Sequence, residues 1–135
     1  MSGGGSGSEA VNMGLRWPLR VTTARCRGVL VVSAAGRLSH STTGALSAAL
    51  QLAVGHEQAG LVIDLGQVDY VSSAGLMALQ AAAARLTQGH GLLVLCDVRE
   101  PVRVALDLAG LTSGFAIESS RELAAARVAR NGGRP

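Results

Sequence analysis

The segment Val71-Ser72-Ser73-Ala74-Gly75-Leu76-Met77-Ala78-Leu79 marks the point where a predicted strand gives way to a predicted helix. Upstream, residues 61–65 form an apolar run of a length typical of a buried strand. Downstream, apolar residues recur at helical spacing at Leu76, Leu79, Ala83 and Leu86. Hydroxyl groups and a glycine therefore stand where the helix begins.

The two serines of this segment suggest two alternative roles. A serine oxygen at the start of a helix can accept a free backbone N–H of the first turn, which is ordinary capping. The same N–H groups and the helix dipole also favour negative charge. A phosphoryl group on that serine would be tolerated by the fold, while it would present about two negative charges to a docked partner. The residues alone leave both a cap and a regulatory switch open.

Outward from this segment, hydrophobic periodicity and glycine positions predict the remaining elements. In chain order these are strands at 19–24 and 29–35, a helix that Ser41 or Thr42 caps and that ends between Gly55 and Gly60, a strand at 61–65, a helix to about Gln88, a strand at 92–96, a helix from Pro101 to Gly110, a strand at 115–117 and a helix at 120–130. Alternating strands and helices imply a mostly parallel sheet with right-handed crossovers. We therefore expect an α/β fold with a central sheet of about five strands packed with about four helices.

The chain of 135 residues fits one domain. Residues 1–13 are rich in Gly and Ser and are expected to be a disordered tag or linker, 14–130 the domain, and 131–135 a frayed tail. The composition is 48% hydrophobic with one Phe, one Tyr and one Trp, so Val, Leu, Ile and Ala must build the core. The expected buried residues are Val31, Leu61, Ile63, Leu76, Leu79, Leu93 and Leu95.

Composition also limits the location and the partners of the protein. No apolar run approaches the roughly 20 residues of a membrane span, and no signal-peptide pattern occurs, so a cytoplasmic protein without membrane insertion is expected. All 12 basic residues are arginine, but they are scattered and lack interleaved aromatic residues, which argues against nucleic-acid binding. Cys26 and Cys96 have no metal-binding spacing and are expected to be free thiols in a reducing compartment.

The sequence gives little sign of catalysis. His40, His56 and His90 are isolated, and Asp64, Asp69 and Asp97 fall at strand ends or in loops without a fixed carboxylate pair for a metal. No phosphate-binding glycine loop and no hydrolase nucleophile elbow occurs. We expect a protein that is not an enzyme, with no catalytic residue, no metal and no cofactor.

The segment Asp69-Tyr70-Val71-Ser72-Ser73-Ala74-Gly75-Leu76 resembles the signature of the STAS domain family, which includes bacterial anti-sigma factor antagonists and the cytoplasmic tails of sulfate transporters. The similarity continues in residues 31–38 followed by Thr42, in residues 61–65 and in residues 108–111. It covers about residues 19–128 with the family's spacing.

The resemblance implies a binding switch. Antagonists of this family bind an anti-sigma factor that is also a serine kinase, are released when it phosphorylates a serine at the start of the second helix, and are restored by a phosphatase. By position in the motif the acceptor maps to Ser73, and Ser72 is the second candidate. The implied partner surface comprises Ser39, His40, Thr42, Ser72, Ala74, Gly75 and Met77.

Two positions depart from the family pattern, because Ser39 and Ser72 stand where acidic residues are usual. The absence of these two carboxylates is expected to change the contact with the kinase. The alternative function is that of a non-catalytic regulatory subunit of a membrane lipid-transport ATPase, which would use the same helix face without phosphorylation. Oligomeric state, including a homodimer, is left open.

Overall fold

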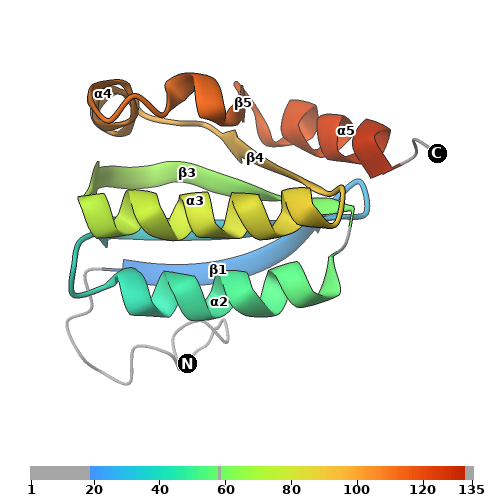
Figure 1. Cartoon of the computed structure of the whole chain (residues 1–135), viewed down its shortest axis with the longest axis horizontal. Coiled ribbons are helices and arrows are strands. Elements are labelled where there is room, and N and C mark those ends of the chain that lie inside the picture. Colours follow the sequence, from blue (N-terminus) through green and yellow to red (C-terminus); the bar gives the residue numbers. More distant parts are fainter. Residues whose placement is uncertain (1–18, 58, 133–135) are drawn as a thin grey trace, which may run out of the picture.

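The computed structural model describes residues 19–57 and 59–132. The elements are β1 (Leu19–Cys26), β2 (Val29–Leu38), α2 (Thr43–His56), β3 (Gly60–Val71), α3 (Ser73–Gln88), β4 (Leu92–Cys96), α4 (Glu100–Leu108), the 3₁₀ helix η1 (Thr112–Gly114), β5 (Ala116–Glu118) and α5 (Arg121–Gly132) (Figure 1). Their order confirms the predicted alternation. The expected disorder of residues 1–13 lies outside the described residues.

The five strands lie side by side in chain order, β1-β2-β3-β4-β5. β1 pairs antiparallel with β2, and the other neighbours are parallel, so the mostly parallel sheet is confirmed. The β1–β2 hairpin turns at Arg27 and Gly28, whose φ angles of 53° and 81° fit a tight turn that follows the twist of the sheet.

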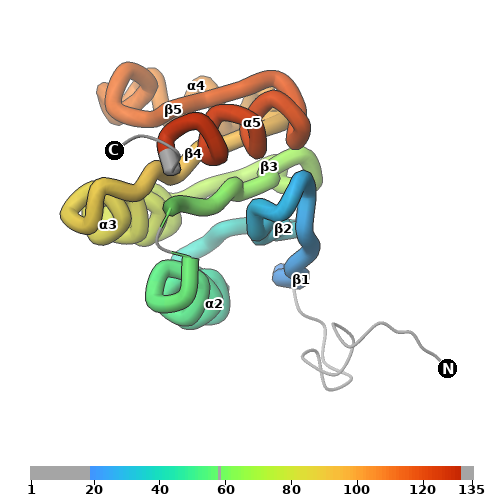
Figure 2. Tube along the Cα trace, turned by 90° about the vertical axis from the view of Figure 1, so that its right-hand side faces the viewer, coloured from blue at the N-terminus to red at the C-terminus, as the bar shows by residue number. Residues whose placement is uncertain are grey.

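Helices cover both faces of the sheet. α2 and α3 pack side by side on one face, where Leu61, Ile63 and Leu65 of β3 point (Figure 2). Val62, between them, points to the opposite face and packs under α5. This alternation follows from the pleat of a strand, and it buries both faces of β3. All seven residues expected in the core are buried.

Three strands are longer than the sequence indicated. β1 continues to Cys26, whereas the predicted strand ended at residue 24. β2 continues through Leu38 and β3 through Val71, whereas the predicted strands ended at residues 35 and 65. The pairing shifts register between Ser33 and Ala35 and again between Gly36 and Arg37. A bulge breaks the alternation of side chains while the backbone pairing goes on, and so the sequence pattern ended too early.

The C-terminal elements differ from the prediction by one or two residues. β5 begins at Ala116 rather than 115, and α5 includes Asn131 and Gly132, which the sequence had assigned to the tail. The Asn131 side-chain amide donates to the His90 carbonyl at 3.0 Å, which holds this end of α5 against the turn after α3. Within the described residues, no helix has the length and apolar character needed to cross a membrane.

Candidate functional site

Ser72 is the cap of α3. Its hydroxyl oxygen accepts the Gly75 backbone N–H at 3.2 Å, and its extended backbone (φ −88°, ψ 171°) is typical of the position before a helix. Its own N–H donates to the carbonyl of Leu38 at 2.7 Å. Ser72 is therefore bound on one side to the helix and on the other to the end of β2.

Ser73 is the first residue of α3 and is exposed to solvent. Among the described residues, its side chain has no hydrogen-bond partner, so its hydroxyl is accessible to an enzyme. The first turn of α3 carries no acidic side chain, and the helix dipole there favours a negative group. The two adjacent serines thus differ in role, and only Ser73 offers a free, exposed hydroxyl.

Gly75 allows α3 to approach the sheet closely. A Cβ at this position would lie 2.8 Å from Val71 Cγ2 and 3.2 Å from the Leu38 carbonyl oxygen. Those distances are too short for an unshifted side chain, so glycine is required by space. Because Leu38 and Val71 end neighbouring parallel strands, the start of α3 and the loop after β2 lie next to each other.

Thr42 holds the loop of residues 39–42 together from inside. It is only 2% exposed; its hydroxyl donates to the Arg37 carbonyl at 2.7 Å and accepts the Ser39 N–H at 2.9 Å. The prediction that Ser41 or Thr42 caps this helix by its side chain is wrong, because Thr42 occupies the N-cap position of α2 without a cap hydrogen bond. The Thr42 hydroxyl forms its hydrogen bonds within the loop instead.

The surface around these two loops combines polar and apolar groups. His40 and Ser73 are exposed, Ser39 and Ala74 are partly exposed, and Met77 is 66% exposed on α3. Thr42 and Gly75, which the sequence placed among the contact residues, are buried and can only position their neighbours.

Arg37 and Tyr70 belong to the same area and were missed from the sequence. They are paired across β2 and β3, and the Arg37 guanidinium lies 4.3 Å from the centre of the Tyr70 ring. Tyr70 is 40% exposed. The only sequence signal was their place immediately before the two loops, since the contact depends on strand register.

Asp69 is exposed on β3 beside Tyr70, whereas Asp64 and Asp97 lie elsewhere in the fold. Asp64 and Asp97 meet Cys96, with one ligand atom of each within 4.8 Å of the others. Asp64, however, already accepts the Arg121 guanidinium at 2.7 Å and the Gly66 N–H at 2.8 Å. Burial, followed by the charges of Asp64 and Asp97, raises the pKa of the Cys96 thiol to about 12. An ion pair beside a neutral thiol describes this group better than a metal site.

Comparisons with known proteins identify one family. The STAS domain family model matches residues 20–124. BtrV of Bordetella bronchiseptica, which carries the provisional designation of anti-sigma factor antagonist, is 35% identical over 108 residues, covering 80% of this chain and 93% of BtrV. An anti-sigma F factor antagonist of Paenibacillus polymyxa is 30% identical over 94 residues, which is 69% of this chain and 80% of that protein. The crystal structure of an anti-sigma factor antagonist from Mycobacterium paratuberculosis superposes with a TM-score of 0.74 at 29% identity, covering 82% of this chain and 94% of that one.

Proposed function

This chain belongs to the STAS domain family, and we propose that it acts as an anti-sigma factor antagonist, a cytoplasmic binding protein that is not an enzyme. Its relatives in Bordetella and Paenibacillus are named for that role. The partner is an anti-sigma factor that is also a serine kinase, and phosphorylation of Ser73 releases it. A phosphatase that acts on the phosphorylated form restores binding.

The observation that carries the proposal is the division of roles between the adjacent serines. Ser72 uses its oxygen to cap α3, whereas Ser73 is exposed without a hydrogen-bond partner among the described residues. A kinase that reaches this turn can therefore phosphorylate the Ser73 hydroxyl without breaking the hydrogen bond by which Ser72 caps α3.

Phosphorylation at Ser73 has opposite effects on the fold and on the complex. The N-terminal end of α3 favours a negative group, typically by about 0.3–1 kcal/mol near an exposed terminus, so the fold survives. Burying a dianion in an interface without a matching cation costs several kcal/mol. The complex therefore dissociates.

The proposed contact surface extends from the loop of residues 39–42 across the start of α3. Ser39, His40, Ser72, Ala74 and Met77 reach it directly, while Thr42 and Gly75 hold the two loops in place. Met77 supplies an exposed apolar side chain of the kind enriched in interfaces. Because Ser39 and Ser72 are uncharged, the kinase must recognise this turn without the carboxylates usual in the family.

The test is co-purification of tagged protein from the native cell extract, followed by phosphosite mapping after incubation with ATP. We expect capture of a small ATP-binding kinase and a phosphate on Ser73. Ser73→Asp should weaken binding by about tenfold or more, since 1.4 kcal/mol suffices for that. Ser73→Ala should bind and resist phosphorylation.

Ser113→Asp is the matched control, because Ser113 is also exposed and lies in η1, outside the proposed surface. It should bind the kinase as the parent does. Phosphate on Ser72 alone, or equal binding by the parent and Ser73→Asp, would contradict the proposal. Capture of a transporter ATPase instead of a kinase would favour the alternative function.

A further inference from the structure

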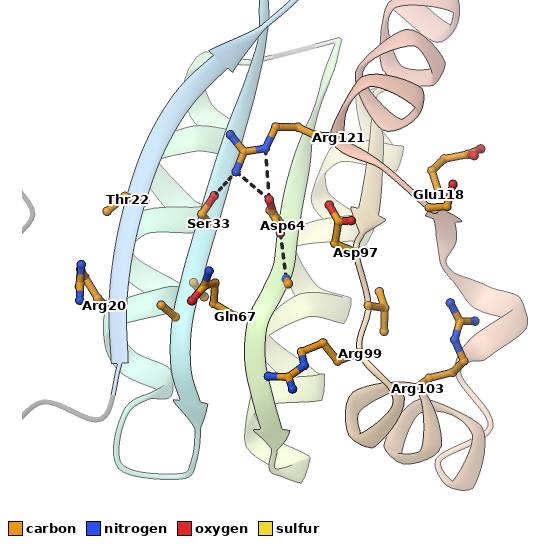
Figure 3. Close-up of a pocket in the computed structure, with 15 residues that line it drawn as sticks. Arg20, Thr22, Ser33, Asp64, Gln67, Asp97, Arg99, Arg103, Glu118 and Arg121 are labelled. Carbon is orange, nitrogen blue, oxygen red and sulfur yellow. Dashed lines mark hydrogen bonds and ion pairs between the residues drawn. The ribbon is translucent and has the colours of Figure 1, made fainter.

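The sheet face under α5 changes from apolar to polar along the strands. α5 covers Val31, Val62 and Val94. Two residues further along, the same face carries Ser33 and Asp64, and strand register places Thr22 and Glu118 in the same row across the sheet. The polar row begins where the cover of α5 ends (Figure 3).

A hollow of about 850 Å³ lies over this polar part of the face. Its floor includes Ala35 and Gly66, whose small size leaves the space open. A Cβ on Gly66 would lie 3.1 Å from Asp64 Oδ1 and 3.2 Å from Asp97 Cβ, so the close packing here depends on glycine. The irregularity between Ser33 and Ala35 falls at this position, and bulges often occur beside functional sites.

Arginines from three elements surround the hollow: Arg20 of β1, Arg99 and Arg103 at the start of α4, and Arg121 of α5. Figure 3 shows the Arg99 side chain reaching towards β3, with Arg20 on the far side of the hollow. Arg99 and Arg103 stand one helical turn apart.

The positive charge of the hollow is largely uncompensated. Of the three lining carboxylates, Asp64 is paired with Arg121 at 2.7 Å and Glu118 with Arg127 at 2.8 Å. Within residues 19–57 and 59–132, no ion pair involves Arg20, Arg99 or Arg103. The lining therefore includes three guanidinium groups and one carboxylate, that of Asp97, that form no ion pair among the described residues.

We propose that this hollow binds a small polyanion, a soluble molecule with at least two phosphate or carboxylate groups. Guanidinium groups match both anions with paired hydrogen bonds. Arg20 and Arg99 lie on opposite sides of the hollow, so a ligand with two or more anionic groups can engage both sides at once. Thr22, Ser33 and Gln67 add neutral hydrogen-bonding groups.

The size of the hollow agrees with a small ligand. Its volume of about 850 Å³ falls within the roughly 300–1,000 Å³ of known small-molecule sites. Neither Ser72, Ser73 nor any residue of the 39–42 loop lines it. The hollow is therefore a second site, separate from the proposed contact surface.

Calorimetric titration with inorganic tripolyphosphate at low salt tests the proposal. We expect saturable binding of one molecule, tighter than that of orthophosphate. The double variant Arg99→Gln/Arg103→Gln should weaken binding by about tenfold or more. The matched control Arg85→Gln/Arg130→Gln loses the same charge from exposed positions outside the hollow and should change affinity by less than about twofold.

Amide chemical shifts of the unmodified protein supply a second measurement. Tripolyphosphate should shift the N–H signals of Gly66 and Gln67, and those of Gly44 and Gly55 on α2 should stay in place. A parallel titration with citrate distinguishes the two anion types. Tighter binding of citrate than of tripolyphosphate would indicate a carboxylate ligand, and the reverse a phosphate ligand.

Three results would overturn the assignment. These are absence of saturable binding at millimolar tripolyphosphate, equal weakening by the control double variant, and orthophosphate affinity equal to that of tripolyphosphate. A glutamate-rich octapeptide that binds more tightly than tripolyphosphate and citrate would assign the hollow to an acidic protein segment instead.

Discussion

The two serines at the start of α3 should separate stability from signalling. Ser72→Ala removes the oxygen that accepts the Gly75 N–H, so we expect a loss of about 1 kcal/mol in the free energy of unfolding. Ser73→Ala removes an exposed hydroxyl and should change that free energy by less than about 0.5 kcal/mol. Urea denaturation of both variants measures the difference. Equal losses of stability in the two variants would mean that both serines, and not Ser72 alone, contribute to capping α3.

Cys96 gives the protein a specific dependence on alkaline pH. Its pKa is raised to about 12 from 9.0, mainly by burial, so the unfolded chain loses this proton first as the pH rises. The contribution to stability is complete below about pH 9, declines above it and is lost as the pH passes 12. Unfolding measured from pH 8 to pH 11 should show a shallower decline for Cys96→Ala than for the parent.

Gly75 matters to the contact between α3 and the ends of β2 and β3. Gly75→Ala forces a methyl group against Val71 and Leu38, and we expect a loss of about 1–3 kcal/mol in the free energy of unfolding. Gly44→Ala is the matched control in the first turn of α2, because a Cβ there meets nothing within 4 Å. It should leave stability unchanged or raise it by up to about 1 kcal/mol. Thermal denaturation of both variants tests this contrast.

The ion pair between Arg121 and Asp64 joins the start of α5 to the sheet. Arg121 contacts Asp64 of β3 and donates to Ser33 Oγ of β2 at 3.0 Å; its pKa is raised, chiefly by the hydrogen bond to Asp64. Arg121→Gln leaves the largely buried Asp64 carboxylate without its partner. We expect a loss of about 1–2 kcal/mol in the free energy of unfolding, a value that takes into account the partial exposure of Arg121.

Arg25→Gln is the control for that variant. Arg25 pairs with Glu57 at 2.8 Å, but its side chain is 56% exposed, and such surface pairs contribute about 0–1 kcal/mol. Chemical denaturation should therefore show a clearly smaller loss than for Arg121→Gln. Equal losses would contradict a special role of Arg121 in fastening α5.

At the scale of the whole molecule, the strands should differ in protection from hydrogen exchange. Leu61, Val62 and Ile63 of β3 are fully buried between two neighbouring strands and two helical layers. β5 has three residues, all partly exposed, and lies at an edge. We expect the slowest amide exchange in β3 and β4 and much faster exchange in β5. Native-state exchange followed by NMR tests this order.

The sequence predicted the elements because each one depends mainly on local pattern. The apolar run at 61–65 and the helical spacing after Leu76 were sufficient to place β3 and α3. The role of Thr42 and the contact of Arg37 with Tyr70 were not predictable in this way, since both require knowing which distant residues are paired. The sequence showed the arginines around the hollow only as scattered residues, because three separate elements bring them together in the fold.

The order of the sheet also has a consequence for synthesis. Since β1 to β5 lie side by side in the order in which the ribosome makes them, each new strand can add to an open edge, and none has to insert between two strands already paired. The apolar face formed by Val31, Val62 and Val94, however, stays uncovered until α5 has been made. A nascent chain therefore carries a nearly complete sheet with one exposed apolar face. Until α5 is made, that face is the main surface to which a chaperone would bind.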